Sequence, residues 1–506
     1  MKSLALFLAL ALAHTTAPVR ADVRLPAHFS DHLVLQAEAG TPVWGWAEPG
    51  KEVAVAVAGQ TQTARADARG KWMVRLPELK RGGPHTLTVK GRNTLTVNDM
   101  LVGEVWLGSG QSNMAMTVNR ARDFEQEQAA ANFPQIRMFT VASAAAAIAQ
   151  EECKGEWVVC SPETVTRFSA TAYFFGREIH QALGTPVGLI NSSVGGTPIE
   201  SWISLEAQQA APELQTALDA APRAEASFDA EAAKLNYEKA LARWKEAVRQ
   251  ARAENQPVPR KPRDPLEVRA RKGSAGGLFN GKIAPLIPYA IRGALWYQGE
   301  ANSTATNARL YRIQLPLLVK DWRTRWGQDF PFAWVQLPNF DGPGRDWPTV
   351  REAMLKTLAL PRTGMAITID IGDAKDIHPK NKQEVGRRLA LWALGAVYGR
   401  KGATSGPLPR GHEIRESEVV LSFAHTDGGL AVSPGESGEV QGFVVAGEDK
   451  QWKPARARID GEKVVVSSTD VKKPVAVRYG WENNPVCNLR NGAGLPASPF
   501  RTDDWE

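Results

Sequence analysis

Four short segments hold residue types suited to acyl transfer, and each follows an apolar run. The first is Gly110-Gln-Ser-Asn-Met114, directly after VGEVWLGS. A small-residue turn between a strand and a helix can expose a serine hydroxyl and aim backbone amides at a developing oxyanion. A serine in this position is more often a helix cap, so Ser112 needs chemical partners before it can be considered a nucleophile.

The second and third segments supply amides and a carboxylate. Gly195 and Gly196 follow PVGLINSS, and paired glycines let the backbone approach a ligand closely, although turn formation alone would also explain them. IRGALWYQ leads into Gln298, Glu300 and Asn302, whose polar groups either donate hydrogen bonds to a carbonyl oxygen or cap a loop.

The fourth segment, Asp370–Pro379, follows the apolar run GMAITI and places His378 two residues after Asp376. This spacing suits a base with an orienting acid. Two alternatives remain: His378 caps a helix that Pro379 starts, or the three aspartates of the segment bind a hard metal together with His378. No complementary set of ligands occurs elsewhere in the chain, so we expect no metal.

The elements that must position these segments form an α/β core. Over residues 102–404, apolar runs of five to seven residues alternate with longer helical patterns, which indicates a parallel sheet covered on both faces. Ligands bind such sheets at the carboxyl ends of the strands, where all four segments fall. Short alternating runs predict an N-terminal β-sandwich over 22–101 and a small C-terminal β region over 405–506.

A charged insertion interrupts the core at residues 206–272. It is rich in alanine and in charged residues, and helix formers dominate it until Pro257 and three further prolines break the pattern. We predict a helical hairpin. It is either a solvated excursion or a dedicated binding arm.

The N-terminal segment 1–21 has Lys2, a short apolar run and a small-residue cleavage motif, and predicts a secretory signal peptide. We therefore expect a periplasmic or secreted protein, and no later stretch is long and apolar enough to span a membrane. In such an oxidising compartment Cys153 and Cys160 either form a disulfide or remain as buried thiols, with Cys487 alone.

The net charge of +7 suggests an anionic partner, but its distribution argues against nucleic acid. Without Lys2 and Arg20 the chain has 59 basic and 54 acidic residues, a balance of +5. Residues 249–272 alone hold eight basic and three acidic residues, which is also +5. The rest of the chain is balanced, so the open question is whether this stretch attracts acidic glycans.

Together the four blocks resemble the sialate O-acetylesterase family, a branch of the SGNH hydrolases. The matching sequences are Gly-Gln-Ser-Asn-Met at 110–114, Gly-Gly-Thr-Pro-Ile-Glu-Ser-Trp at 195–202, Trp-Tyr-Gln-Gly-Glu-Ala-Asn at 296–302 and Asp-Ile-His-Pro-Lys-Asn-Lys at 376–382. The resemblance covers nearly all of the mature chain. It implies an SGNH, flavodoxin-like hydrolase core and a reaction without a metal or organic cofactor.

The resemblance also implies roles. Ser112 is expected as the nucleophile and His378 as its general base. The oxyanion hole is expected to combine the backbone amides of Ser112 and of Gly195 or Gly196 with the side-chain amide of Gln298 or Asn302. The superfamily places an aspartate three residues before the histidine, where this chain has Lys375. Asp376 is therefore the candidate acid, or only a helper beside a backbone carbonyl.

The implied reaction removes O-acetyl groups from sugars through an acyl-enzyme. Candidate substrate contacts are Gln111, Asn113, Glu300, Trp202, Trp296, Trp347 and Arg345, the last as a partner for the carboxylate of a sialic acid. An acetylated hemicellulose such as xylan or xyloglucan would need no such cation. Two alternatives stay open: a carbohydrate-binding protein that has lost activity, and a lipid esterase. The sequence favours no particular oligomeric state.

Overall fold

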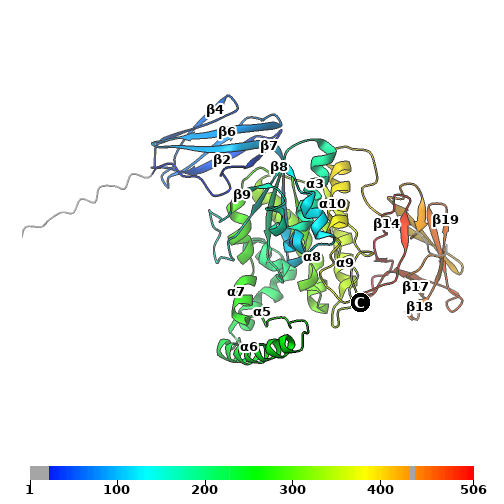
Figure 1. Cartoon of the computed structure of the whole chain (residues 1–506). Coiled ribbons are helices and arrows are strands. Elements are labelled where there is room, and N and C mark those ends of the chain that lie inside the picture. The colour runs from blue at the N-terminus through cyan, green and yellow to red at the C-terminus, as the bar shows by residue number, and fades with distance from the viewer. Residues whose placement is uncertain (1–21, 227, 434–438, 506) are drawn as a thin grey trace, which may run out of the picture.

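The computed structural model describes residues 22–226, 228–433 and 439–505. The predicted signal peptide lies outside these described residues. Figure 1 shows an N-terminal β region, a central α/β core and a C-terminal β region in succession, with the inserted helices extending from the core. Within the described part of the chain, no helix combines the length and apolarity needed to cross a membrane.

The core sheet has the strand order β13-β12-β11-β7-β10-β8-β9. Its strands are β7 (Thr94–Gly110), β8 (Phe133–Thr140), β9 (Trp157–Cys160), β10 (Val187–Ser193), β11 (Gly293–Tyr297), β12 (Phe332–Val335) and β13 (Thr363–Ala366). All neighbours are parallel except the edge pair of β8 and β9.

The predicted parallel sheet is therefore confirmed. Counted along the chain without the β8–β9 edge hairpin, the strands β10, β7, β11, β12 and β13 follow the order 2-1-3-4-5 of flavodoxin-like sheets. In this arrangement β7 lies between β10 on one side and β11 on the other. The crevice beyond the carboxyl end of β7 is the topological switch point where such sheets bind ligands.

Helices cover both faces of the sheet. On one face α3 (Ala170–Leu183) and α10 (Lys382–Ala396) pack on side chains that include Leu295 and Tyr297. On the other face α8 (Ala305–Trp326) and α9 (Trp347–Thr357) pack on the alternate side chains, which include Ala294 and Trp296. Because both faces are buried, the strands are continuously apolar, as the sequence pattern indicated.

The N-terminal β region is continuous with the core through β7. Its other strands are β1 (Val34–Gln36), β2 (Thr41–Trp46), β3 (Glu52–Val57), β4 (Gln60–Arg65), β5 (Lys71–Leu76) and β6 (Gly82–Lys90). The first part of β7 pairs with β6 and β1, and its last part pairs with β10 and β11. The boundary predicted between residues 101 and 102 thus lies inside one strand.

The C-terminal β region consists of two four-stranded sheets and a strand pair around their own apolar core. Its strands are β14 (Leu408–Arg415), β15 (Glu418–Ala424), β16 (Leu430–Val432), β17 (Phe443–Ala446), β18 (Lys453–Pro454), β19 (Arg456–Asp460), β20 (Lys463–Ser467), β21 (Ala476–Tyr479), β22 (Leu489–Asn491) and β23 (Phe500–Arg501). Cys153, Cys160 and Cys487 are all free thiols, so the disulfide alternative does not hold in this structure.

The insertion is helical, as expected, with α4 (Leu205–Gln209), α5 (Gln215–Ala226), α6 (Ala230–Ala253) and α7 (Pro265–Lys272). Between α6 and α7 runs an extended segment, residues 254–264, which we call the arm. The indole Nε1 of Trp244 on α6 donates a hydrogen bond to the carbonyl oxygen of Pro259, 2.7 Å away, and holds the arm against the helix. At its other end, Asp264 caps α7 through its side chain.

Candidate active site

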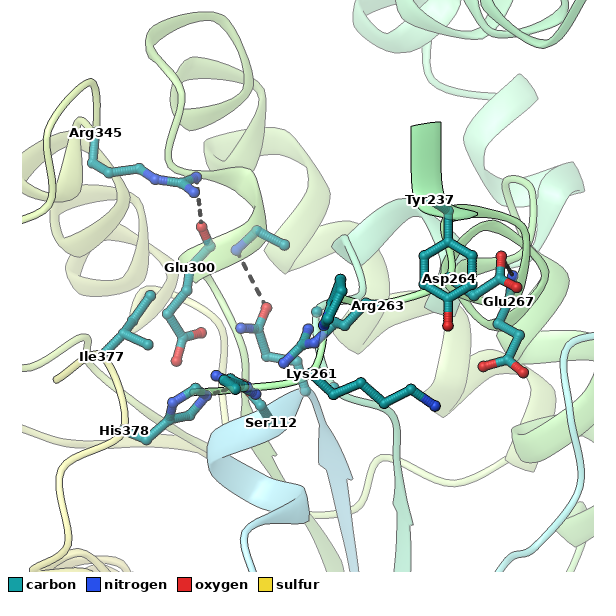
Figure 2. A pocket seen from close by; sticks show the side chains of 16 residues that line it. Ser112, Tyr237, Lys261, Arg263, Asp264, Glu267, Glu300, Arg345, Ile377 and His378 are labelled. Atoms are coloured by element: carbon teal, nitrogen blue, oxygen red, sulfur yellow. Dashed lines mark hydrogen bonds between the residues drawn. The ribbon is translucent and has the colours of Figure 1, made fainter. Parts of the chain in front are cut away.

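A cavity of 830 Å³ lies at the carboxyl ends of β7, β10 and β11 (Figure 2). Three groups of residues line it. The strand ends contribute Gln111, Ser112, Gly195, Gly196, Glu300 and Ala301. The segments after β12 and β13 contribute Arg345, Ile377 and His378, and the insertion contributes Tyr237, Arg260, Lys261, Pro262, Arg263, Asp264 and Glu267. The predicted blocks therefore meet at one site.

Ser112 and His378 are in direct contact within this cavity. The serine Oγ lies 2.8 Å from the imidazole Nε2, a hydrogen-bond distance, although the residues are 266 positions apart. Ser112 begins helix α1 (Ser112–Ala115), so its backbone N–H has no partner inside that helix. The turn before it requires Gly110, whose φ is +131° and where a Cβ would lie 2.2 Å from the carbonyl oxygen of Tyr297.

Asp376 orients the loop that carries His378. Its Oδ1 accepts a hydrogen bond from the backbone N–H of His378 at 2.9 Å and lies 3.6 Å from the imidazole Nδ1. The second distance is too long for a hydrogen bond, and the Asp376 side chain is 49% exposed. Burial lowers the pKa of His378, and the Asp376 charge opposes this shift. The imidazole is therefore kept neutral, as a general base requires.

Two predicted oxyanion donors are placed elsewhere. The Nε2 of Gln298 donates to the Thr197 carbonyl oxygen and to Asn302 Oδ1, while the Nδ2 of Asn302 donates to Glu200 Oε2. Gln298 and Asn302 are buried and do not line the cavity. The prediction that one of them completes the oxyanion hole is wrong, because these amides hold the loops behind the site together.

Gly195, Gly196 and Gln111 line the cavity together with Ser112. Gly195 is so close to the nucleophile that a Cβ there would lie 3.4 Å from the Ser112 Cβ, and Gly196 beside it has a φ of +75°. The Oε1 of Gln111 accepts from the backbone N–H of Ala301 at 3.3 Å. This bond fixes the side chain of Gln111, which lines the cavity.

Asn113 and Glu300 are buried rather than exposed to a substrate. Asn113 is 0% exposed and lies outside the cavity lining, so its predicted role as a substrate contact is wrong. Glu300 is 2% exposed, borders the cavity, and has an Oε2 atom without a hydrogen-bond partner among the described residues. Burial raises the pKa of its carboxyl group. Lys382, which the sequence reasoning did not select, donates to Asn113 Oδ1 from a fully buried position.

The three tryptophans predicted near the substrate belong to the core. Trp202, Trp296 and Trp347 are each 0% exposed. Trp296 packs edge-on between Trp202 and Trp322, with ring centroids 5.9 and 6.0 Å away. No face of these rings is open to a sugar, so their assignment as substrate contacts is wrong. Burying a large aromatic side chain in the core stabilises the fold more than leaving it exposed at a binding site does.

The cationic residues of the cavity come from two directions. Arg345 lies on the loop before α9, and its Nη1 donates to the backbone carbonyl oxygen of Glu300 at 3.3 Å. Arg260, Lys261 and Arg263 come from the arm, so the insertion forms one wall of the cavity. Two acidic residues of the insertion, Asp264 at the end of the arm and Glu267 on α7, lie beside Tyr237 in Figure 2.

No group of three or more His, Cys, Asp or Glu residues suited to holding a metal ion occurs in the described ranges. Asp370, one of the three aspartates in the metal alternative, forms ion pairs with Arg388 and Arg490. Asp373 accepts hydrogen bonds from the backbone N–H groups of Lys375 and Asp376. These carboxylates shape the loop, and they do not converge with His378 on a common centre.

The chain is similar to known carbohydrate esterases. The family model described as "Carbohydrate esterase, sialic acid-specific acetylesterase" matches residues 102–255 and 281–394, more than half of the chain. Sialate O-acetylesterase of Mus musculus is 29% identical over 94% of this chain and 94% of its own length. The enzyme of the same name from Homo sapiens is 29% identical over 94% of this chain and 92% of its own.

A solved structure is similar over almost the whole length. The crystal structure of XAC1771, described as a novel carbohydrate acetylesterase from Xanthomonas citri, is 38% identical with a TM-score of 0.81. The match covers 96% of this chain and 100% of that one. The family model leaves out residues 256–280, which include most of the arm. The chain belongs to the carbohydrate esterase family of sialic acid-specific acetylesterases and is a carboxylic ester hydrolase that removes O-acetyl groups from sugars.

Proposed function

We propose that the protein deacetylates sugars through an acetyl-enzyme formed on Ser112. The observation that carries the proposal is the 2.8 Å contact between Ser112 Oγ and His378 Nε2 at the open end of β7. A serine hydroxyl is a weak nucleophile until an adjacent base accepts its proton, and a neutral imidazole at this distance is such a base.

In the first half of the reaction, His378 Nε2 takes the Ser112 proton as Oγ bonds to the acetyl carbonyl carbon. The oxyanion is stabilised by the backbone N–H of Ser112, by a backbone N–H at Gly195 or Gly196, and by the Gln111 amide in place of the predicted Gln298 or Asn302. The bond between the carbonyl carbon and the sugar oxygen breaks, and His378 returns the proton to the sugar. Water then repeats these steps and releases acetate.

The lining of the cavity supports a sugar rather than a long acyl chain. Its walls carry cations and carboxylates from the insertion, together with Arg345 and Glu300. A long alkyl chain would remove water from these charged groups without offering them hydrogen bonds in return. Arg260, Lys261, Arg263 and Arg345 favour a sugar with a carboxylate, as in a sialic acid. A neutral hemicellulose ester is the second candidate, and a binding protein without activity would leave the Ser112–His378 contact unexplained.

A substrate panel tests this proposal. Wild type and Ser112→Ala would be incubated with acetylated sialic acids, with acetylated xylan and xyloglucan oligosaccharides, and with an aryl acetate. We expect acetate release by the wild type alone. Full activity of Ser112→Ala on the aryl acetate would overturn the mechanism, and a long-chain acyl ester hydrolysed faster than the acetate would overturn the sugar assignment.

The arm provides a second test with a matched control. Lys261→Ala and Arg263→Ala remove exposed cations at the cavity, whereas Arg249→Ala removes an exposed cation of the same insertion that pairs with Glu246 outside the cavity. Exposed charge pairs contribute less than about 1 kcal/mol, so each cavity variant should raise KM for an acidic sugar about two- to fivefold. KM for the aryl acetate should not change, and Arg249→Ala should match the wild type. Equal KM values for the acidic sugar in all variants would favour a neutral substrate.

We further propose that the protein is exported to the periplasm or outside the cell. The support is the sequence pattern of residues 1–21. Expression of the full chain with N-terminal sequencing of the product tests it: cleavage before Asp22 is the expected result, and an uncleaved cytoplasmic product would contradict it.

A further inference from the structure

A hydrogen-bonded network lies directly behind Ser112 and His378. It consists of Asn113 from α1, Glu300 from the turn after β11, and Lys382 at the start of α10. Asn113 Nδ2 donates to Glu300 Oε1 at 2.5 Å, and Lys382 Nζ donates to Asn113 Oδ1 at 2.6 Å. We call these three residues the Asn113 bridge, because one amide joins a buried cation to a buried carboxyl group.

The Asn113 bridge is costly for folding. Lys382 is 0% exposed, and its Nζ contacts the neutral Asn113 oxygen and the ring of Tyr297, whose centroid is 4.9 Å away. Burial lowers the pKa of Lys382 to about 7, although the charge of Glu300 acts in the opposite direction. Glu300 keeps an oxygen without a hydrogen-bond partner among the described residues. Apolar side chains of similar volume would fill this site at a lower cost.

The position of the bridge suggests what it contributes. Asn113 follows Ser112 in the chain, and its Nδ2 also donates to the carbonyl oxygen of Ile377, the residue before His378, at 3.0 Å. One side chain therefore fixes the backbone next to the nucleophile against the backbone next to the base. We propose that Lys382, Asn113 and Glu300 are positioning residues that hold Ser112 and His378 in register for proton transfer.

The bridge also affects the base electrostatically. After burial, which lowers the pKa of His378, the largest effects come from Asp376, which raises it, and from Lys382, Arg120 and Arg260, which lower it. Lys382 is the buried member of this set, so its charge is the least screened by water. Removing that charge must raise the pKa of His378. This inference rests on the proposed Ser112–His378 mechanism.

Two substitutions of Lys382 separate its hydrogen bond from its charge. Lys382→Met removes both, and kcat for the aryl acetate should fall about tenfold to a hundredfold with little change in KM, because the reacting groups are misaligned. Lys382→Gln removes the charge but keeps a donor for Asn113 Oδ1, and it should recover most of the lost kcat. In both variants the acid limb of the kcat/KM profile should move to higher pH.

Lys380→Met is the matched control, since Lys380 is exposed, lies two residues from Lys382 and is not among the charges with the largest effects on the pKa of His378. It should match the wild type in rate and in pH profile. Folding would be monitored by Tm. If Lys382→Met does not fold, the pH profile of Lys382→Gln carries the test, and an unshifted acid limb there overturns the proposal.

Wild-type kinetics in folded Lys382→Met would also overturn the positioning role. If Lys382→Met has wild-type kinetics and Ser112→Ala is inactive in the same assay, the positioning role is overturned but the proposed function is not. If Ser112→Ala is active, the proposed function itself fails. The two failures are therefore distinguishable.

Discussion

Asp376→Asn should reduce activity only moderately, unlike the loss of the acid in a directly hydrogen-bonded triad. The asparagine Oδ1 can still accept the hydrogen bond from the His378 N–H, which spans 2.9 Å in the wild type, so the loop keeps its shape. The substitution removes only the negative charge near Nδ1. We expect kcat for an aryl acetate to fall about fivefold to tenfold.

The magnitude follows from the geometry. Asp376 Oδ1 lies 3.6 Å from His378 Nδ1, and the carboxylate is 49% exposed, so a water-like dielectric applies. Coulomb's law then gives an interaction of about 1 kcal/mol between the carboxylate and the protonated imidazole, which corresponds to about 0.8 of a pKa unit. A buried triad acid that bonds the imidazole directly is worth about ten-thousandfold in kcat. The two roles therefore differ by about three orders of magnitude in rate.

The pH dependence of kcat/KM tests independently in which direction the Asp376 charge shifts the pKa of His378. Because the Asp376 charge raises the pKa of His378, its removal should lower that pKa further. The neutral base then persists to lower pH, and the acid limb of the kcat/KM profile shifts downward. Asp373→Asn is the control, since Asp373 Oδ1 also accepts backbone hydrogen bonds in this loop, but the Asp373 charge is not among those with the largest effects on the pKa of His378. A loss of about a thousandfold or more in Asp376→Asn, or a shift of its acid limb to higher pH, would refute the reasoning.

Three further substitutions test separate parts of the site. Gln111→Ala should lower kcat about a hundredfold if its amide stabilises the oxyanion, and unchanged kcat in steady-state assays would exclude that role. Gly110→Ala should give little folded protein in thermal melts, because a Cβ there would lie 2.2 Å from the Tyr297 oxygen; a normal Tm would show that the turn can relax. Trp296→Phe should lower Tm through lost core packing while leaving KM for the sugar unchanged, and a raised KM with a normal Tm would restore Trp296 as a sugar contact.

The architecture of the core could be predicted from patterns along the chain, whereas the pairing of Ser112 with His378 was implied by the resemblance of the four blocks to the family. Doubly buried strands read as continuous apolar runs, and the residue after each run reaches the same edge of the sheet. Ser112 follows β7 and His378 lies in the segment between β13 and α10, so both stand at the same edge of the sheet. Because β11 and β12 separate β7 from β13, the segment after β13 must also run along that edge to bring His378 Nε2 within 2.8 Å of Ser112 Oγ.

Patterns along the chain could not predict which way a side chain points or which neighbours form hydrogen bonds with it. Gln298 and Asn302 stand at the end of β11 as expected, but Thr197, Glu200 and one another satisfy their amides. The sequence places a residue at a strand end without stating which neighbours it meets. For the same reason Trp296 was assigned to the substrate although its ring is enclosed by other aromatic rings of the core.

The place of the arm was left open, and Lys382 was missed, for a different reason. The contact of the arm with the cavity depends on how the insertion folds back on the core, a long-range arrangement without a local pattern. The basic composition of residues 249–272 was the available signal, and it left two alternatives open, a solvated edge or a rim that draws acidic glycans toward the serine. The structure places Arg260, Lys261 and Arg263 of this stretch in the cavity lining. Lys382 lies in the fourth block, but a lysine near a helix start is usually solvated, and nothing in its neighbours indicates burial.

The central claim is that Ser112 carries the acetyl group between the two halves of the reaction. Rapid quenching of the wild type with an aryl acetate, followed by peptide mass spectrometry, measures this directly. We expect acetylation on the peptide that contains Ser112 in the wild type, much slower acetylation in His378→Ala, and none in Ser112→Ala. Turnover by the wild type with no acetylated Ser112 at any quench time, together with an active Ser112→Ala, would contradict it.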